Sequence, residues 1–70
     1  MYKEGFPSKL KHARIQNGLT QIDVEAAIKI KRMNLSRYET GAREPDIETL
    51  GKLSDFYNVS ADWLLGSKGK

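Results

Sequence analysis

The sequence predicts an all-α fold, a compact five-helix bundle that forms a single domain. Apolar residues recur at spacings of three and four along most of the chain, and no segment shows a sustained alternation of apolar and polar residues. Residues that cap or end helices separate five such segments. The chain has 70 residues, 39% of them hydrophobic, which suffices for one core. We expect the domain to cover residues 1–66 and residues 67–70 to form a flexible tail.

The first helix should begin at Phe6, with Pro7 in its first turn, because proline is well tolerated there. Asn17 and Gly18 favour the end of this helix. Thr20 then provides the N-cap of a second helix. The inward residues expected of these two helices are Phe6, Leu10 and Ala13, and Val24, Ala27 and Ile28.

A third helix, over residues 31–39, restarts the apolar pattern shortly after the second ends, and Gly41 stops it. Two short helices joined by a tight turn form a helix-turn-helix motif. Leu35 and Tyr38 lie about 60° apart around the third helix, so they share a face that must turn inward. The residues that face outward are Arg32, Met33, Ser36 and Arg37.

The outward face of the third helix carries groups that suit DNA. Guanidinium groups can bind the guanine edge bidentately, a hydroxyl suits phosphate or base edges, and an apolar tip can contact a thymine methyl. The alternative interpretation is that the two arginines merely solvate an exposed helix. The helix-turn-helix context favours the first interpretation, since the second helix of that motif enters the major groove.

A fourth helix follows an N-cap signal at Pro45 and Asp46, and a short fifth helix follows Ser60. Asn58 and Gly66 can take the left-handed conformation that ends these two helices. The inward residues expected of the fourth helix are Ile47, Leu50, Leu53 and Tyr57.

The fifth helix carries three consecutive large apolar residues, Trp63, Leu64 and Leu65. One helical turn cannot bury all three on a single side. We expect Trp63 to close the core, and the two leucines either to be singly exposed or to contribute to a dimer patch.

Charge is distributed unevenly along the chain. Residues 1–43 contain nine Lys and Arg against four Asp and Glu, a net +5, whereas residues 44–70 contain three Lys against five acids, a net −2. Such asymmetry suggests a polyanionic partner, such as double-stranded DNA, on one side of the molecule. A merely solvated surface is the alternative.

Several kinds of chemistry are excluded or disfavoured. Cysteine is absent, which excludes disulfides and thiolate chemistry, and the lone histidine, His12, has no second ligand at metal spacing. The chain contains no phosphate-binding loop, dinucleotide fingerprint or nucleophilic serine motif. We therefore expect no enzyme activity, cofactor, metal or small-molecule substrate. No signal-peptide or membrane-span pattern is present, so we expect a soluble, cytoplasmic protein without a membrane partner.

Three stretches together resemble one family: "LTQIDVEAAIKIKRMNLSRYETG" (residues 19–41), the following "GAREPDIETLGKL", and "VSADWLLG". They are similar to the five-helix DNA-binding domain of the lambdoid phage repressor and Cro family, also called the XRE family. The resemblance implies a sequence-specific transcriptional regulator, a repressor that binds a palindromic operator as a homodimer with residues 31–39 in the major groove. The alternative is a protein-interaction module of the same fold, as in an antitoxin or anti-repressor partner, with weak or no specific DNA binding.

The resemblance also implies roles for single residues. Gln21 matches a position at a helix N-terminus that contacts phosphate, as the helix dipole favours. Arg43 matches a position that contacts the DNA backbone or minor groove, and Arg14 and Glu39 match a partly buried salt bridge. Lys31, at the helix start, matches a phosphate contact. The positions that contact base edges and phosphates in the family correspond to Lys31, Arg32, Met33 and Arg37.

Two residues depart from the family pattern. Lys29 stands where glycine usually supplies a left-handed turn, and lysine costs about 1 kcal/mol more in that conformation. This favours a turn built differently, for example with one more residue of helix. Glu25 stands where a small residue usually lets the two helices approach. It must reach water or pair with Lys29 or Arg32, and either pairing could tilt the third helix.

Overall fold

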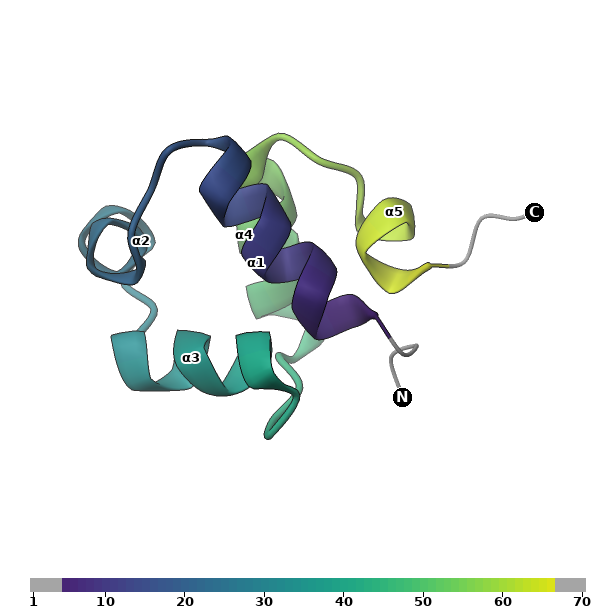
Figure 1. Ribbon diagram of the computed structural model, residues 1–70, viewed down its shortest axis with the longest axis horizontal. Helices are drawn as coiled ribbons and strands as arrows, with labels where there is room; N and C mark the ends of the chain where they lie inside the picture. Colours follow the sequence, from purple (N-terminus) through teal and green to yellow (C-terminus); the bar gives the residue numbers. More distant parts are fainter. Residues whose placement is uncertain (1–4, 67–70) are drawn as a thin grey trace.

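The computed structural model describes residues 5–66, and the predicted tail, residues 67–70, lies outside this range. The described part consists of five α-helices without a strand, which confirms the predicted fold class (Figure 1). No helix in it is long and apolar enough to cross a membrane. The helices are α1 (Phe6–Gln16), α2 (Gln21–Ile28), α3 (Arg32–Thr40), α4 (Ile47–Tyr57) and α5 (Ala61–Leu65).

The predicted starts of α2, α4 and α5 are confirmed by their capping contacts, whereas α3 runs one residue later than predicted, over Arg32–Thr40. The Thr20 hydroxyl accepts a hydrogen bond from the Asp23 backbone N–H at 3.1 Å, and Asp23 Oδ2 accepts one from the Thr20 N–H at 2.8 Å. The bond from the Thr20 backbone N–H stabilises the Asp23 carboxylate and holds the pKa of Asp23 below its usual value. The side chains of Asp46 and Ser60 cap α4 and α5 with one bond each, accepted from the backbone N–H groups of Thr49 and Trp63. Short local motifs therefore set the helix starts.

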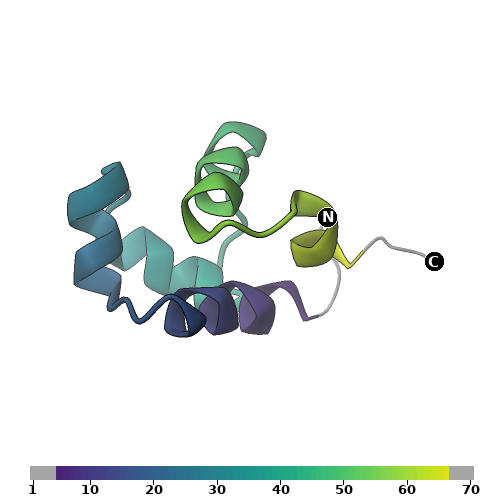
Figure 2. The same ribbon diagram turned by 90° about the horizontal axis from the view of Figure 1, so that it is seen from above.

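The core lies where α1 packs against α3 and α5, and where α4 meets α5. Figures 1 and 2 both show α2 and α5 at opposite ends of the molecule. As predicted, the three residues expected to face inward from α1, Leu35 and Tyr38 of α3, and most of those expected from α4 point inward. The buried apolar residues are Phe6, Leu10, Ala13, Val24, Ile30, Leu35, Tyr38, Leu50, Leu53, Tyr57 and Leu64.

Three inward predictions are wrong. Ala27 is exposed, because Ala27 and Ile28 lie on opposite flanks of Val24, and α2 turns the Ile28 flank toward the core. Ile47 is 76% exposed, since it is the first residue of α4 and precedes the buried stripe. In α5, Leu64 rather than Trp63 closes the core: Leu64 is fully buried and Trp63 is 39% exposed.

The Trp63 indole lies on the outside of α1 instead. The Lys9 ammonium lies 5.6 Å from its ring centroid, and the His12 ring centroid is 6.5 Å away. Lys9 Nζ also donates a hydrogen bond to the Trp63 carbonyl oxygen at 3.1 Å. These contacts attach α5 to α1 and suit an aromatic ring that stays partly exposed.

The turn between α2 and α3 is built with the left-handed residue, so the expectation of a different turn is wrong. Lys29 has φ 64° and ψ 34°, and α2 gains no extra residue. The Lys29 N–H donates to the Glu25 carbonyl oxygen at 2.9 Å, and the buried Ile30 anchors the turn. Packing of Ile30 and α3 therefore outweighs the roughly 1 kcal/mol that the lysine backbone costs.

Candidate nucleic-acid interface

The structure holds α3 by one face and exposes the other. Leu35 is fully buried and Tyr38 is 7% exposed, as their shared face predicts. On the opposite side, Met33 is 63% exposed and both arginines of the helix are exposed. The cationic side chains are therefore free to meet a partner, while the apolar ones fix the helix in place.

A shallow recess lies between the start of α2 and the outward face of α3. It brings together five of the seven residues predicted to bind DNA, which come from two helices. The recess is lined by Gln21, Arg32, Met33, Ser36 and Arg37.

The other two predicted residues flank the recess. Lys31 is the N-cap of α3 rather than part of the helix, and it is exposed. Arg43 lies in the loop after α3, also exposed, and its backbone N–H donates to the Arg37 carbonyl oxygen at 3.3 Å. The two residues thus extend the row of cations beyond each end of the helix.

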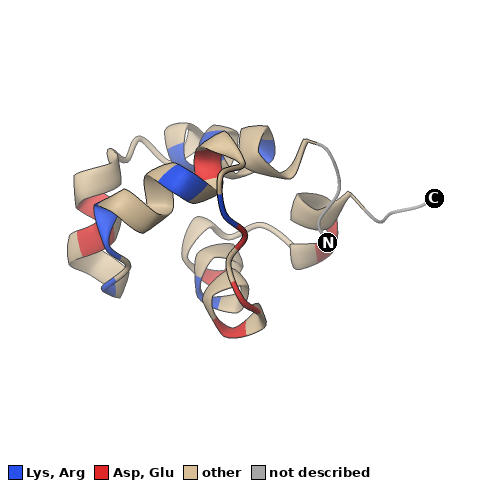
Figure 3. Cartoon of the chain, turned by 90° about the horizontal axis from the view of Figure 1, so that it is seen from below, with Lys and Arg blue, Asp and Glu red and all other residues tan. Residues whose placement is uncertain are grey.

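The charge of this side is strongly positive. Between residues 29 and 43 the sequence has five Lys and Arg, and its one acid, Glu39, is neutralised by Arg14. Figure 3, which looks at the α3 side, shows Lys and Arg along α3 and in the loop after it, with acids gathered at the start of α4. An exposed cationic helix next to an acidic region favours one orientation toward a polyanion.

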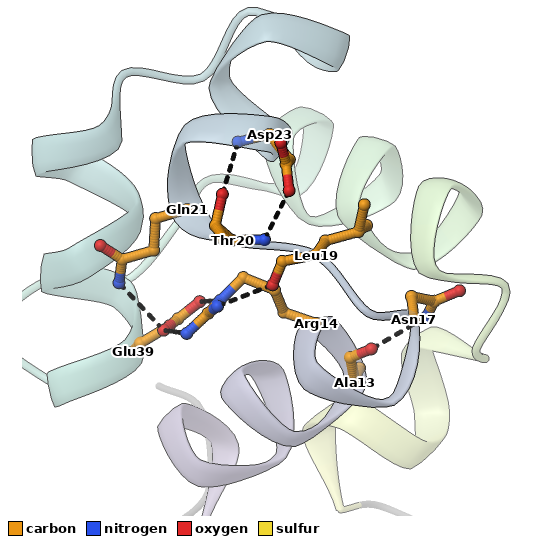
Figure 4. Close-up of polar contacts among 8 residues, drawn as sticks. All are labelled: Ala13, Arg14, Asn17, Leu19, Thr20, Gln21, Asp23 and Glu39. Atoms are coloured by element: carbon orange, nitrogen blue, oxygen red, sulfur yellow. Dashed lines mark hydrogen bonds and ion pairs between the residues drawn. The ribbon is translucent and has the colours of Figure 1, made fainter.

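The salt bridge expected between Arg14 and Glu39 is present, and it links α1 to α3 (Figure 4). Arg14 Nε donates to Glu39 Oε2 at 2.8 Å and Nη2 donates to Oε1 at 3.0 Å. The remaining Arg14 nitrogen, Nη1, donates to the Leu19 carbonyl oxygen at 2.9 Å, which fixes the loop before α2. The bond to Glu39 raises the pKa of Arg14 above its ordinary value.

Two contacts at this junction were not predicted from the sequence. Gln21 Nε2 donates to Glu39 Oε1 at 3.1 Å, and Asn17 Nδ2 donates to the carbonyl oxygens of Ala13 and Tyr57 at 2.8 and 3.1 Å. The contact of Gln21 with Glu39 and that of Asn17 with Tyr57 join segments far apart in the chain, and no local pattern signals such a pairing. They tie the start of α2 to α3 and the end of α1 to α4.

One buried polar atom lies close to this network without a partner. The Tyr57 hydroxyl has no hydrogen-bond partner among the described residues, and the residue is 2% exposed. Burial and the nearby Glu39 charge both disfavour the phenolate and raise the pKa of Tyr57 well above its ordinary value. Tyr57 therefore contributes its ring to the core rather than a titrating group to the surface.

Of the two alternatives expected for Glu25, contact with water or an ion pair, the structure shows the first. Among residues 5–66 it makes no ion pair with Lys29 or Arg32, and its side chain is half-buried at the side of α2. It therefore reaches water, and no charge contact from Glu25 holds α3. The described residues also contain no cluster of His, Asp and Glu that could hold a metal ion.

Comparisons with known proteins agree with this geometry. The pattern of the helix-turn-helix family HTH_3 matches residues 10–64. The chain is 50% identical over 58 residues to the HTH-type transcriptional regulator ImmR of Bacillus subtilis (strain 168), covering 83% of this chain and 46% of ImmR. It is 35% identical over 54 residues to the cryptic phage CTXphi transcriptional repressor RstR of Vibrio cholerae, covering 77% of this chain and 49% of RstR.

A solved structure shares the fold. The S. venezulae BldD DNA-binding domain superposes with a TM-score of 0.79 at 33% identity, covering 91% of this chain and 96% of that domain. This chain spans about half the length of the two curated relatives. The relatives are transcriptional regulators rather than enzymes, as the sequence predicted for this chain. With its five helices and the matched residues 10–64, the chain belongs to the HTH_3 (XRE) family of helix-turn-helix domains.

Proposed function

We propose that this chain is the DNA-binding part of a transcriptional repressor and that α3 enters the major groove. The observation that carries the proposal is that Arg32, Met33 and Arg37 are exposed, with the half-buried Ser36 beside them, on a helix whose other face is buried. Such a helix can approach base edges without losing its packing. The names of ImmR and RstR, a regulator and a phage repressor, support the same function.

The side chains around the recess suit different parts of DNA. Arg32 and Arg37 suit the guanine edge, and Met33 suits a thymine methyl. Lys31 and Gln21 suit phosphates, because they lie at the starts of α3 and α2, where backbone N–H groups also favour an anion. The Ser36 hydroxyl can bind either a phosphate or a base edge. Arg43 suits the backbone or minor groove beside the site.

We further propose that two copies bind a palindromic operator. The surface that suits self-association is α5, where Trp63 is 39% exposed and Leu65 is only partly covered by the core. Because α5 lies at the end of the molecule away from α2, a contact there would leave both copies of α3 free (Figure 1). Such dimers bind two half-sites whose centres lie about one helical turn of DNA, or 34 Å, apart.

Selection of bound duplexes from a random pool tests the proposal. A recovered palindrome would support base readout and a dimer together, and a single half-site would contradict the dimer. The affinity for the recovered duplex should fall by orders of magnitude between about 50 and 200 mM salt, because several phosphate contacts release counterions. Failure to enrich any sequence, with a flat salt response, would instead favour a protein-interaction module.

A further inference from the structure

An acidic residue lies directly behind the basic recess. Glu39 belongs to α3, yet its side chain is only 3% exposed, so it cannot contact DNA. Its two carboxylate oxygens accept hydrogen bonds from both Arg14 and Gln21. Arg14 comes from α1 and Gln21 is the first residue of α2, so this carboxylate joins three helices.

The pairing with Arg14 fixes the carboxylate in one orientation. A guanidinium that donates from two nitrogens holds both oxygens of a carboxylate in its plane. Here the donors are Nε at 2.8 Å and Nη2 at 3.0 Å, and Arg14 itself is only 11% exposed. Oε1 therefore has a defined position when it accepts from Gln21 at 3.1 Å.

The carboxylate also decides which end of the Gln21 amide turns inward. An ionised carboxylate only accepts hydrogen bonds, so it can bind the NH₂ end of the amide and not the carbonyl end. Figure 4 shows the Gln21 carbonyl oxygen turned away from Glu39. One N–H of Gln21 is thus held by Glu39, the other is not taken up by a described residue, and the Gln21 residue lines the recess.

From this geometry we propose that Glu39 is a positioning residue for DNA binding, which holds the Gln21 amide so that its second N–H meets a phosphate at the edge of the recess. The proposal rests on the DNA-binding function proposed above. Without Glu39 the glutamine side chain would be ordered only on binding, at an entropic cost. Immobilising such a side chain weakens binding about fivefold.

The direct test is Glu39→Gln, compared with Glu48→Gln, measured on the duplex recovered by selection and at one salt concentration. Both variants remove one negative charge, and Glu48 is exposed on α4. Charge alone would strengthen binding in both. We expect Glu39→Gln to bind about fivefold more weakly than Glu48→Gln. Equal or tighter binding by Glu39→Gln would overturn the proposal.

A double-mutant cycle with Gln21→Met separates positioning from general damage. Gln21→Met removes the amide and leaves the pair of Arg14 and Glu39 intact. We expect the loss caused by Glu39→Gln to disappear in the Gln21→Met background, because there is no amide left to hold. The same loss in both backgrounds would show that Glu39 acts only through the fold, and would overturn the proposal.

Because Glu39→Gln leaves Arg14 without its counter-charge and could unfold the domain, Arg14→Lys provides a second variant. Lysine keeps the charge but cannot hold both carboxylate oxygens. Nitrogen-15 relaxation of the Gln21 side-chain amide, measured without DNA, should show a rigid amide in the unmodified protein and a more mobile one in Arg14→Lys. A mobile amide in the unmodified protein would overturn the proposal.

The outcomes also separate this inference from the function on which it rests. If the unmodified protein binds no duplex specifically, both the function and the positioning role fail. If it binds specifically and the effects of Glu39→Gln and Gln21→Met simply add, the positioning role alone fails.

Discussion

Single residues of α3 and its flanks are expected to contribute differently to DNA binding. Arg37 is exposed within the helix and lines the recess, whereas Lys31 precedes the helix at its N-cap. A guanidinium can bind a base edge, while an ammonium at the groove wall acts as a point charge on a phosphate. The two cations should therefore differ in specificity rather than only in strength.

We expect Arg37→Ala to cost about 1–3 kcal/mol on the selected duplex and to relax the preference at one base position. Lys31→Ala should weaken binding to all DNA sequences alike. It should also lower, by about one, the slope of the logarithm of the binding constant against the logarithm of the salt concentration. Competition binding against single-base variants of the duplex measures both. An equal loss for Arg37→Ala on selected and random duplexes would refute its contact with a base.

The unpartnered Tyr57 hydroxyl makes a second prediction at this scale. Tyr57→Phe removes a buried polar atom without disturbing the ring, so it should leave the free energy of unfolding unchanged or raise it by about 1 kcal/mol. Urea denaturation measures the change. A clear loss of stability would mean that the hydroxyl has a bonding partner in solution.

Tyr57 also predicts how stability depends on alkaline pH. Its pKa is raised in the folded state, chiefly by burial, so the folded protein keeps a proton that the unfolded chain releases. The contribution is fully present below the ordinary tyrosine pKa of about 10 and is lost as pH rises above it. The fall in stability above pH 10 should be smaller in Tyr57→Phe, and an identical fall in both proteins would contradict this.

At the scale of helices, the turn between α2 and α3 contains the strained residue. Lys29 has a left-handed backbone at φ 64°, where glycine is favoured. We expect Lys29→Gly to raise the free energy of unfolding by about 1 kcal/mol, as thermal or urea unfolding would measure. Asn58→Gly, at φ 59°, is the matched control. Its free energy of unfolding should rise less, because asparagine tolerates the left-handed conformation better than lysine does. Destabilisation by Lys29→Gly would show that its side chain stabilises the turn.

The contact between α1 and α3 depends on the pair of Arg14 and Glu39. Arg14→Ala would leave a carboxylate that is 3% exposed without its counter-charge, and should cost about 3–5 kcal/mol of stability. Calorimetry can compare it with Arg43→Ala, an exposed arginine whose loss should be nearly neutral. Similar unfolding temperatures for the two variants would contradict the structural importance of the pair.

Helix boundaries were largely predictable from the sequence. Which face of a helix is buried was harder to predict. The caps at Thr20, Asp46 and Ser60 rest on contacts within a few residues, so local patterns suffice. Whether Ala27 or Ile28 flanks the core, and whether Trp63 or Leu64 closes it, depends on how the helices pack. Spacing alone leaves both choices open in helices this short.

At the scale of the whole molecule, the fold places the outward residues of α3 beside the start of α2. The residues of this surface were predicted from the sequence. The recess itself was not, because it forms only where α2 packs against α3. The contact of Gln21 with Glu39 spans 18 positions, which periodicity does not address. The same packing separates the cationic α3 side from the acids at the start of α4 (Figure 3).

A titration with the selected duplex, followed by the backbone amide signals in nuclear magnetic resonance spectra, tests the central claim most directly. If α3 enters the groove, the largest shifts will map to residues 31–37, the start of α2 and the loop at Arg43. The buried side of α3 and the first turn of α4 will change little. Shifts confined to α4 and α5, with α3 unaffected, would contradict the claim that the exposed face of α3 binds DNA.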